Sequence, residues 1–298
     1  MPARPMQFHL FLPQMRLSFD QLVERAVAAE AAGFNGIALM DHLTPPAAAD
    51  QPMFEAMVTA TWLAARTTTL RVGHLVLCDS FRHPAMLARE AVSIDHASGG
   101  RFELGIGWGS VPDELATFGV GSTRAGERVE RLAESLDVVT ALWTGAAVDH
   151  DGSHFRVAGG AQAPAPVNGR IPIVIGGAGP KTMALVRRHA DWWNCPMHQL
   201  HRFDEARANA GDARVSVQQM VTFVADDADR DQVVATADRR FGWMAPDGRT
   251  TGNADELVAH FDRLGRRGVE RVYAWFTDFA APETLVAFGD GVVAPLAS

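Results

Sequence analysis

The sequence predicts an α/β fold, specifically a (β/α)8 TIM barrel with an insertion after the fourth βα unit. Two observations predict it. Short apolar runs of strand length alternate with longer segments of helical spacing, and eight such runs fit into 298 residues without a visible domain boundary. Repeated βα units imply parallel strands joined by helical crossovers. An open doubly wound sheet is the alternative, but eight evenly spaced units favour closure. We expect one domain over residues 1–298.

The first half of the chain supplies four βα units. Ser18 is a typical N-cap before an amphipathic stretch that ends at Gly33, and Pro84 is typical of a first helical turn. Gly99-Gly100 ends the third helix. We expect strands at residues 8–12, 36–40, 70–77 and 102–106, and helices at 19–32, 54–66, 83–97 and 124–143.

The alternation is interrupted once and then resumes. Residues 145–170 are dominated by Gly, Ala, Pro and Asn, so we interpret them as the insertion. Strands five to eight are expected at residues 171–175, 191–194, 214–224 and 269–276, with a helix at 180–189.

Composition narrows the function. The 27 Lys and Arg against 35 Asp and Glu give a net charge of −8, which argues against nucleic-acid binding. No apolar run approaches the roughly 20 residues of a membrane span, and no leader pattern is visible. Cys78 and Cys195 are too few for a disulfide framework or a thiolate metal cluster, and no metal-ligand spacing occurs. We therefore expect a cytoplasmic enzyme without a metal.

In a (β/α)8 barrel the active site lies at the carboxyl ends of the strands. Asp41 and His42 follow the second predicted strand. A histidine there can transfer a proton near neutral pH, and an adjacent carboxylate can orient it. A helix-capping or loop role is the alternative, and we favour the functional interpretation.

Two glycine-rich loops follow the fourth and fifth strands. Gly176-Gly177-Ala178-Gly179 precedes a helix whose first turn carries Lys181, the only lysine of the chain. Backbone amides at such a helix start favour a phosphate, although a tight βα turn explains the loop equally well. Gly107 and Trp108 belong to the other loop, where a flat ligand could approach the backbone and stack on the indole. Burial of Trp108 in the barrel is the alternative.

Several motifs occur together in an order that resembles the bacterial luciferase-like monooxygenase superfamily. They span about residues 6–194. The matching segments are residues 31–36, 41–42, 82–84, 98–102, 105–109, 113–114, 172–177 and 190–194.

The resemblance implies a barrel, usually homodimeric, that holds FMN or the deazaflavin coenzyme F420 at its mouth. Asp41-His42 and the loop at Gly176 are more similar to the F420 branch, in which the matching histidine assists hydride transfer. It further implies a non-proline cis peptide at Leu75–Val76. The expected cofactor contacts are Asp41, Leu75, Val76, Cys78, Gly107, Trp108, Gly176, Gly177, Ala178, Gly179 and Lys181.

The substrate pocket departs from the sugar-phosphate dehydrogenases of that branch. They carry a carboxylate where Ser110 stands and an aromatic residue where Pro46 stands. The C-terminal third also shows no cationic cluster, so we expect a neutral or weakly polar small organic substrate. Arg82, Arg124 and Arg128 could form a cationic rim for the cofactor.

We therefore predict hydride transfer between F420 and a small substrate, with His42 as the catalytic acid or base. An FMN-dependent monooxygenase served by a separate reductase is the first alternative. A flavin-binding protein without turnover is the second.

Overall fold

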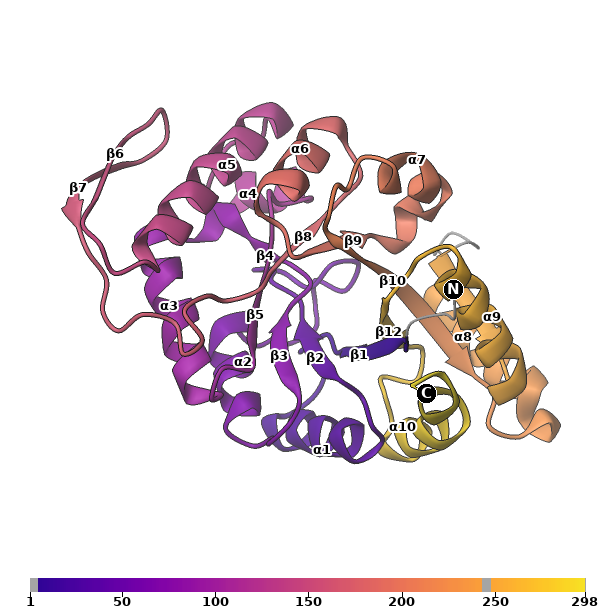
Figure 1. The fold of residues 1–298 in the computed structure, drawn as a ribbon. Coiled ribbons are helices and arrows are strands. Elements are labelled where there is room, and N and C mark those ends of the chain that lie inside the picture. Colours follow the sequence, from indigo (N-terminus) through magenta and orange to yellow (C-terminus); the bar gives the residue numbers. More distant parts are fainter. Residues whose placement is uncertain (1–4, 243–247, 298) are drawn as a thin grey trace.

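The computed structural model describes residues 5–242 and 248–297, and it confirms the predicted barrel. Eight parallel strands form a closed circle, in which the last strand pairs with the first and the order otherwise follows the chain (Figure 1). They are β1 (Gln7–Phe11), β2 (Gly36–Leu39), β3 (Arg71–His74), β5 (Phe102–Gly107), β8 (Ile173–Gly176), β9 (Trp192–Cys195), β10 (Arg214–Phe223) and β12 (Arg271–Phe276).

Helices surround this circle (Figure 1). They are α1 (Phe19–Ala31), α2 (Ala56–Ala64), α3 (Pro84–Ala97), α4 (Pro112–Phe118), α5 (Ala125–Leu142), α6 (Pro180–His189), α7 (Phe203–Arg207), α8 (Arg230–Phe241), α9 (Ala254–Arg266), α10 (Pro282–Phe288) and α11 (Ala294–Leu296). Ser18 forms a capping box with Gln21 at the start of α1. None of the described helices combines the length and the apolar character needed to cross a membrane.

Three features depart from the simple alternation. The run predicted as one strand at 70–77 divides into β3 and β4 (Leu77–Cys78), because the Leu75–Val76 peptide between them is cis, as the resemblance implied. Between α5 and β8, the strands β6 (Val148–Asp151) and β7 (Arg156–Gly160) form an antiparallel hairpin that projects from the barrel (Figure 1). The polar β11 (Arg249–Gly252), which the hydrophobic pattern did not predict, pairs with the second half of β10.

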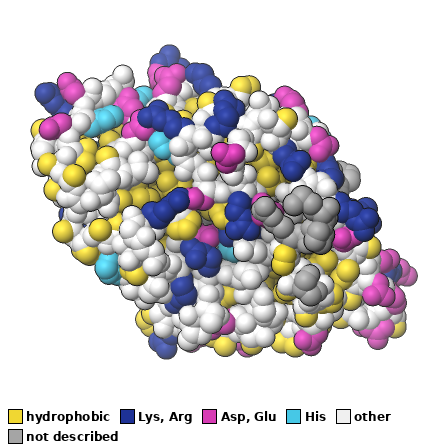
Figure 2. All heavy atoms as spheres, in the orientation of Figure 1, with side chains coloured by type: hydrophobic (Ala, Val, Ile, Leu, Met, Phe, Trp, Pro, Cys, Tyr) yellow, Lys and Arg dark blue, Asp and Glu magenta, His cyan; other side chains and the backbone are white. Residues whose placement is uncertain are grey.

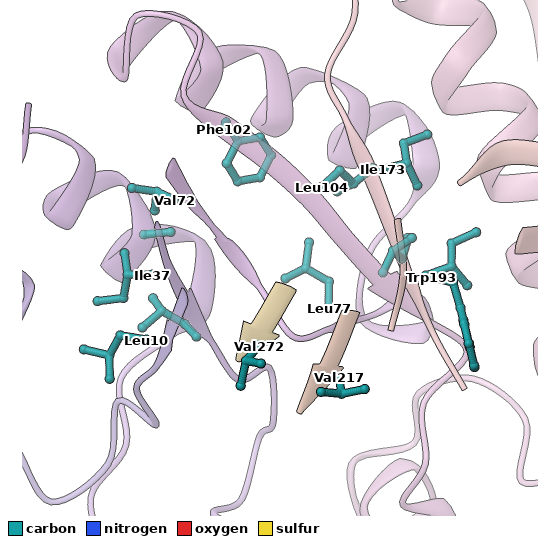
Figure 3. Close-up of a cluster of buried hydrophobic side chains, with 14 of the residues drawn as sticks. Leu10, Ile37, Val72, Leu77, Phe102, Leu104, Ile173, Trp193, Val217 and Val272 are labelled. Atoms are coloured by element: carbon teal, nitrogen blue, oxygen red, sulfur yellow. The ribbon is translucent and has the colours of Figure 1, made fainter. Parts of the chain in front are cut away.

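Alternate side chains of each strand point outward or inward. Outward-facing residues such as Leu10, Ile37 and Ile173 belong to one large core packed under the helices (Figure 3). At the amino-terminal end of the barrel, Glu103 on β5 accepts hydrogen bonds from Arg71 and Arg271 at 2.5 and 2.7 Å. Since β5 and β12 are not neighbours, this ion network crosses the barrel interior and fills its lower end.

The upper interior has little side-chain volume. Gly105 faces β3 so closely that a Cβ there would lie 1.8 Å from the carbonyl oxygen of His74. At the carboxyl ends of their strands, Gly107 on β5 and Gly176 on β8 likewise contribute no side chain. The barrel is therefore filled at its amino-terminal end and hollow at its carboxyl-terminal end, where the strand-end residues lie.

Candidate active site

Two adjoining cavities open at the carboxyl ends of the strands. The first, of about 200 Å³, is lined by the loops after β2, β4, β5, β8 and β9, and we call it the glycine cavity after Gly107, Gly109, Gly176 and Gly177. The second, of about 590 Å³, lies toward β1, β12 and α8, and we call it the apolar cavity. Residues shared by both are His42, Leu75, Ser110, Val111, His198 and Gln218.

His42 lies at this junction and is held by Glu114 of α4. Its Nδ1 lies 2.9 Å from Glu114 Oε2, while Oε1 accepts the backbone N–H groups of Leu43 and Thr44 at 2.6 and 2.8 Å. Glu114 is buried. An ionised carboxylate only accepts, so this contact places the Nδ1 proton of His42 toward Glu114 and leaves Nε2 free for a ligand.

Asp41 points elsewhere. Its carboxylate accepts two hydrogen bonds from Arg82, at 2.6 and 3.1 Å, and one from the N–H of Cys78 at 2.8 Å. Asp41 lines the glycine cavity, so its contact with the cofactor stays a prediction, but the carboxylate that holds His42 is Glu114 rather than Asp41. Arg82, expected on a cationic rim, is half-buried and pairs with Asp41 and Glu55, and these partners raise its pKa although desolvation opposes the charge.

The cis peptide brings Val76 against the glycines of the neighbouring strands. A Cβ at Gly107 would lie 2.7 Å from Val76 Cγ2, and one at Gly176 would lie 3.5 Å from Val76 Cγ1. Leu75, Val76 and the two glycines therefore make a wall that a flat ring can approach. Cys78 lines the same cavity, but burial raises the pKa of its thiol to about 12, so it is no nucleophile at neutral pH.

The residues of the predicted phosphate loop, 176–181, lie in different environments. Gly176 and Gly177 line the glycine cavity, Ala178 is buried, and Gly179 begins α6 without a side-chain cap, which leaves its first amides open to an anion. Lys181, in contrast, lines neither cavity: it is exposed, and its amine lies 3.0 Å from Glu130 on α5. Its expected cofactor contact therefore has no support in this geometry.

Trp108 lines the glycine cavity, so it is not simply buried in the barrel. The guanidinium of Arg128 lies 5.0 Å from the centre of its ring. Arg128 itself is buried and donates to the carbonyl of Ser122, while Arg124 is exposed beside Glu127. The expected rim of Arg82, Arg124 and Arg128 is thus not assembled around either cavity.

Sequence reasoning missed several residues that the fold brings to the site. Glu114 was visible only as part of a matching segment, and its place one helical turn after the Gly107 loop was the available signal. Gln218 was hidden in a strand. Arg239 and Arg240 line the apolar cavity with Arg16, although we expected no cationic cluster from the C-terminal third. Charged side chains of both signs are spread over the face of the molecule that Figure 2 shows.

Comparison with known proteins identifies the family of this chain. The sequence profile of the family described as luciferase-like monooxygenase matches residues 6–291. An F420-dependent glucose-6-phosphate dehydrogenase of Mycobacterium avium (strain 104) is 35% identical over 179 residues, which are 59% of this chain and 52% of that protein. One of Nocardia farcinica (strain IFM 10152) is 30% identical over 235 residues, covering 74% and 68%. The chain thus spans about half the length of the first of these relatives.

Solved structures share the fold at low identity. An F420-dependent secondary alcohol dehydrogenase in complex with an F420–acetone adduct superposes with a TM-score of 0.81 at 16% identity, covering 99% of both chains. The EDTA monooxygenase of Chelativorans sp. BNC1 gives a TM-score of 0.80 at 19% identity, covering 98% of this chain and 93% of its own. At such identities the likeness establishes the barrel alone.

Proposed function

Since this chain belongs to the luciferase-like monooxygenase family, we propose that it is an oxidoreductase that transfers a hydride between coenzyme F420 and a small organic substrate. The observation that carries the proposal is the His42–Glu114 pair at the junction of the two cavities. The F420-dependent relatives at 30 to 35% identity support the choice of cofactor.

The glycine cavity suits the cofactor. Gly176 has no side chain, and a Cβ at this position would already lie 3.5 Å from Val76 Cγ1. The glycine therefore keeps the wall beside Val76 open for a planar ring. The uncapped start of α6 suits a phosphate next to Gly177, because helix amides and the helix dipole both favour an anion. The cofactor would be held by ten residues of the strand ends and loops. They are Asp41, Leu75, Val76, Cys78, Gly107, Trp108, Gly176, Gly177, Ala178 and Gly179.

When bound, the deazaflavin supplies the carbon that accepts or donates the hydride. The chain supplies the proton. His42 Nε2 takes the proton of a substrate hydroxyl during oxidation, or returns it to the carbonyl oxygen during reduction. Glu114 keeps the ring of His42 in the required orientation and stabilises it when it is charged. The apolar walls of the second cavity exclude water around the reacting carbon.

The sharpest test combines binding with turnover. Purified cofactor-free protein is titrated with F420 and with FMN, and we expect tight binding of F420 alone. Replacing His42 with Ala removes the proton-transfer group, so turnover should fall about 10²- to 10⁴-fold while the F420 dissociation constant stays nearly unchanged. Unchanged turnover of this variant, or binding of neither cofactor, contradicts the proposal.

An FMN-dependent monooxygenase is the second candidate. The uncapped α6 start and the glycine wall suit FMN as well, and monooxygenases occur among the structures that share the fold. Preference for FMN in the same titration would transfer the proposal to this reaction, which needs a separate reductase.

We also propose a homodimer. Val58 and Trp62 on α2 and Met86 on α3 are exposed large hydrophobic side chains, and a second subunit would cover them. Sedimentation of the purified chain tests this directly. The cytoplasm remains the predicted compartment.

A further inference from the structure

The apolar cavity is lined by a floor of large apolar side chains and, at its rim, by three arginines. Six large apolar side chains form its floor: Phe11, Met15, Met40, Phe241, Trp275 and Phe279. Arg16, Arg239 and Arg240 also line it, and none of the described residues that line it is acidic. This sign of charge is opposite to that of the chain, whose net charge is −8.

The three guanidinium groups retain most of their hydrogen-bonding capacity. Arg239 donates to the hydroxyl of Thr236, and Arg240 donates to the carbonyl of Thr277. The guanidinium groups of Arg16 and Arg240 lie 5.8 and 5.3 Å from the centre of the Phe279 ring. Among the described residues, no carboxylate forms an ion pair with Arg16, Arg239 or Arg240. Because each guanidinium carries five N–H donors, several remain free for a ligand.

This arrangement comes from two distant segments of the chain. Arg16 follows β1 with a φ of 64°, a left-handed conformation that is uncommon for arginine, and Arg239 and Arg240 lie at the end of α8. All three arginines are exposed. Arg16 and Arg240, from distant segments, converge on the ring of Phe279, and Arg239 lines the same cavity. A solvated charge run on one helix would not show this convergence.

The part of the apolar cavity that adjoins the glycine cavity is lined by polar side chains. His42 and Gln218 lie there, where the apolar cavity meets the glycine cavity. The side-chain amide of Gln218 makes no hydrogen bond to another described residue. A ligand that fills the cavity thus meets polar groups at the reacting end, apolar side chains along its body and guanidinium groups at its far end.

We propose that the substrate of this site is a hydrophobic carboxylic acid, with an apolar body over the aromatic floor and a carboxylate held by Arg16, Arg239 and Arg240. The inference rests on the proposed function for the reaction at the His42 end. It replaces the expectation of a neutral substrate. Guanidinium groups pair with carboxylates by charge-assisted and often bidentate hydrogen bonds, which a neutral amide cannot replace.

The experiment compares acids with their uncharged counterparts. Calorimetric titrations of the full chain, with and without F420, use phenylacetate, 3-phenylpropanoate and 4-phenylbutanoate and the three matching primary amides. We expect at least one acid to bind about tenfold or more tightly than its amide, because hydrogen bonds between charged groups are stronger than those to a neutral amide. The preference should shrink with rising salt.

Variants locate the effect. Arg16→Gln and Arg240→Gln should each reduce the preference for the acid several-fold, whereas Arg263→Gln should not, since Arg263 is an exposed arginine on α9 that lines neither cavity. Melting temperatures identify any variant that fails to fold. If Arg16→Gln folds poorly, the preference for the acid is measured with Arg239→Gln and Arg240→Gln instead.

Three outcomes overturn the inference. They are equal binding of acids and amides, binding of no compound in the series, and arginine variants that weaken F420 while the acid preference persists. The last would assign the arginines to the acidic tail of the cofactor. Failure of F420 to bind, with the acid preference and its dependence on the arginines intact, would instead reject the proposed function and leave the acid site standing.

Discussion

Replacing Glu114 with Gln should invert the hydrogen bonding of His42 while leaving the fold intact. Glu114 Oε1 receives the N–H groups of Leu43 and Thr44, so the amide oxygen of Gln must occupy that position. Its NH₂ group then faces His42 Nδ1, which has to accept rather than donate. The proton of the neutral ring moves to Nε2, and the atom proposed as the base loses its lone pair.

Glu114→Gln should have a small effect on stability and a large effect on turnover. Both backbone hydrogen bonds persist, weakened from charged to neutral acceptors, so stability should fall by about 1–2 kcal/mol. The loss of a correctly protonated acid–base group should reduce turnover about 10²- to 10⁴-fold. The variant should therefore be almost as slow as His42→Ala, and the double variant no slower than His42→Ala, because Glu114 acts through His42.

The assay has a spectroscopic part and a kinetic part. Nitrogen-15 NMR of histidine-labelled protein reports which ring nitrogen of His42 carries the proton, and needs no substrate. Turnover and the F420 dissociation constant are measured beside it. Asp113→Asn is the matched control, since Asp113 is exposed on the same turn of α4 and loses the same charge. An unchanged tautomer in Glu114→Gln, or turnover equal to that of Asp113→Asn, refutes the reasoning.

Three further predictions concern the cavity, the lower barrel and the thiols. Gly176→Ala should preserve the melting temperature, because its Cβ finds only ordinary contacts at Val76, yet weaken F420 binding by occupying part of the ring space; a titration decides. Burial alone would raise the pKa of Glu103, but neighbouring arginines outweigh it and lower the pKa from 4.5 to about 2. The unfolded state therefore binds more protons between these values, so chemical denaturation should show stability falling from pH 4.5 to 2, and less so in Glu103→Gln. Burial raises the pKa of both Cys78 and Cys195 to about 12, so a disulfide reagent at pH 8 should label neither in the native chain and both after denaturation.

The barrel was predictable because its strands are buried on both faces. Parallel strands covered by helices read as continuous apolar runs, and the run at β8, Ile173–Gly176, was located to within two residues. The same rule explains the failures. β11 has the sequence Arg-Thr-Thr-Gly and pairs at the edge of β10, outside the closed circle, so it carries no apolar signal. The break between β3 and β4 lies inside an apolar run and is invisible to hydrophobicity.

The site was predictable only where position along a strand determines position in space. Asp41 and His42 were located because strand ends converge in a barrel. Glu114 lies 72 residues from His42, and only the packing of α4 reveals that they touch. Arg239 and Arg240 lie in α8, a helix with few buried residues, whose position over the barrel follows from tertiary contacts rather than from its own pattern.

The loop after β2 is held from two sides, and this explains why adjacent acidic and basic residues have different roles. Asp41 is anchored to Arg82 and to the start of β4, while His42, the next residue, is anchored to Glu114. Asp41 and Glu114 are both buried, so reorienting either carboxylate would leave a polar partner unsatisfied. The position of His42 Nε2 therefore depends on Arg82 as well as on Glu114. A proton-transfer atom at the junction of two cavities needs such double support, because a shift of about 1 Å from either side would move it away from the reacting atom.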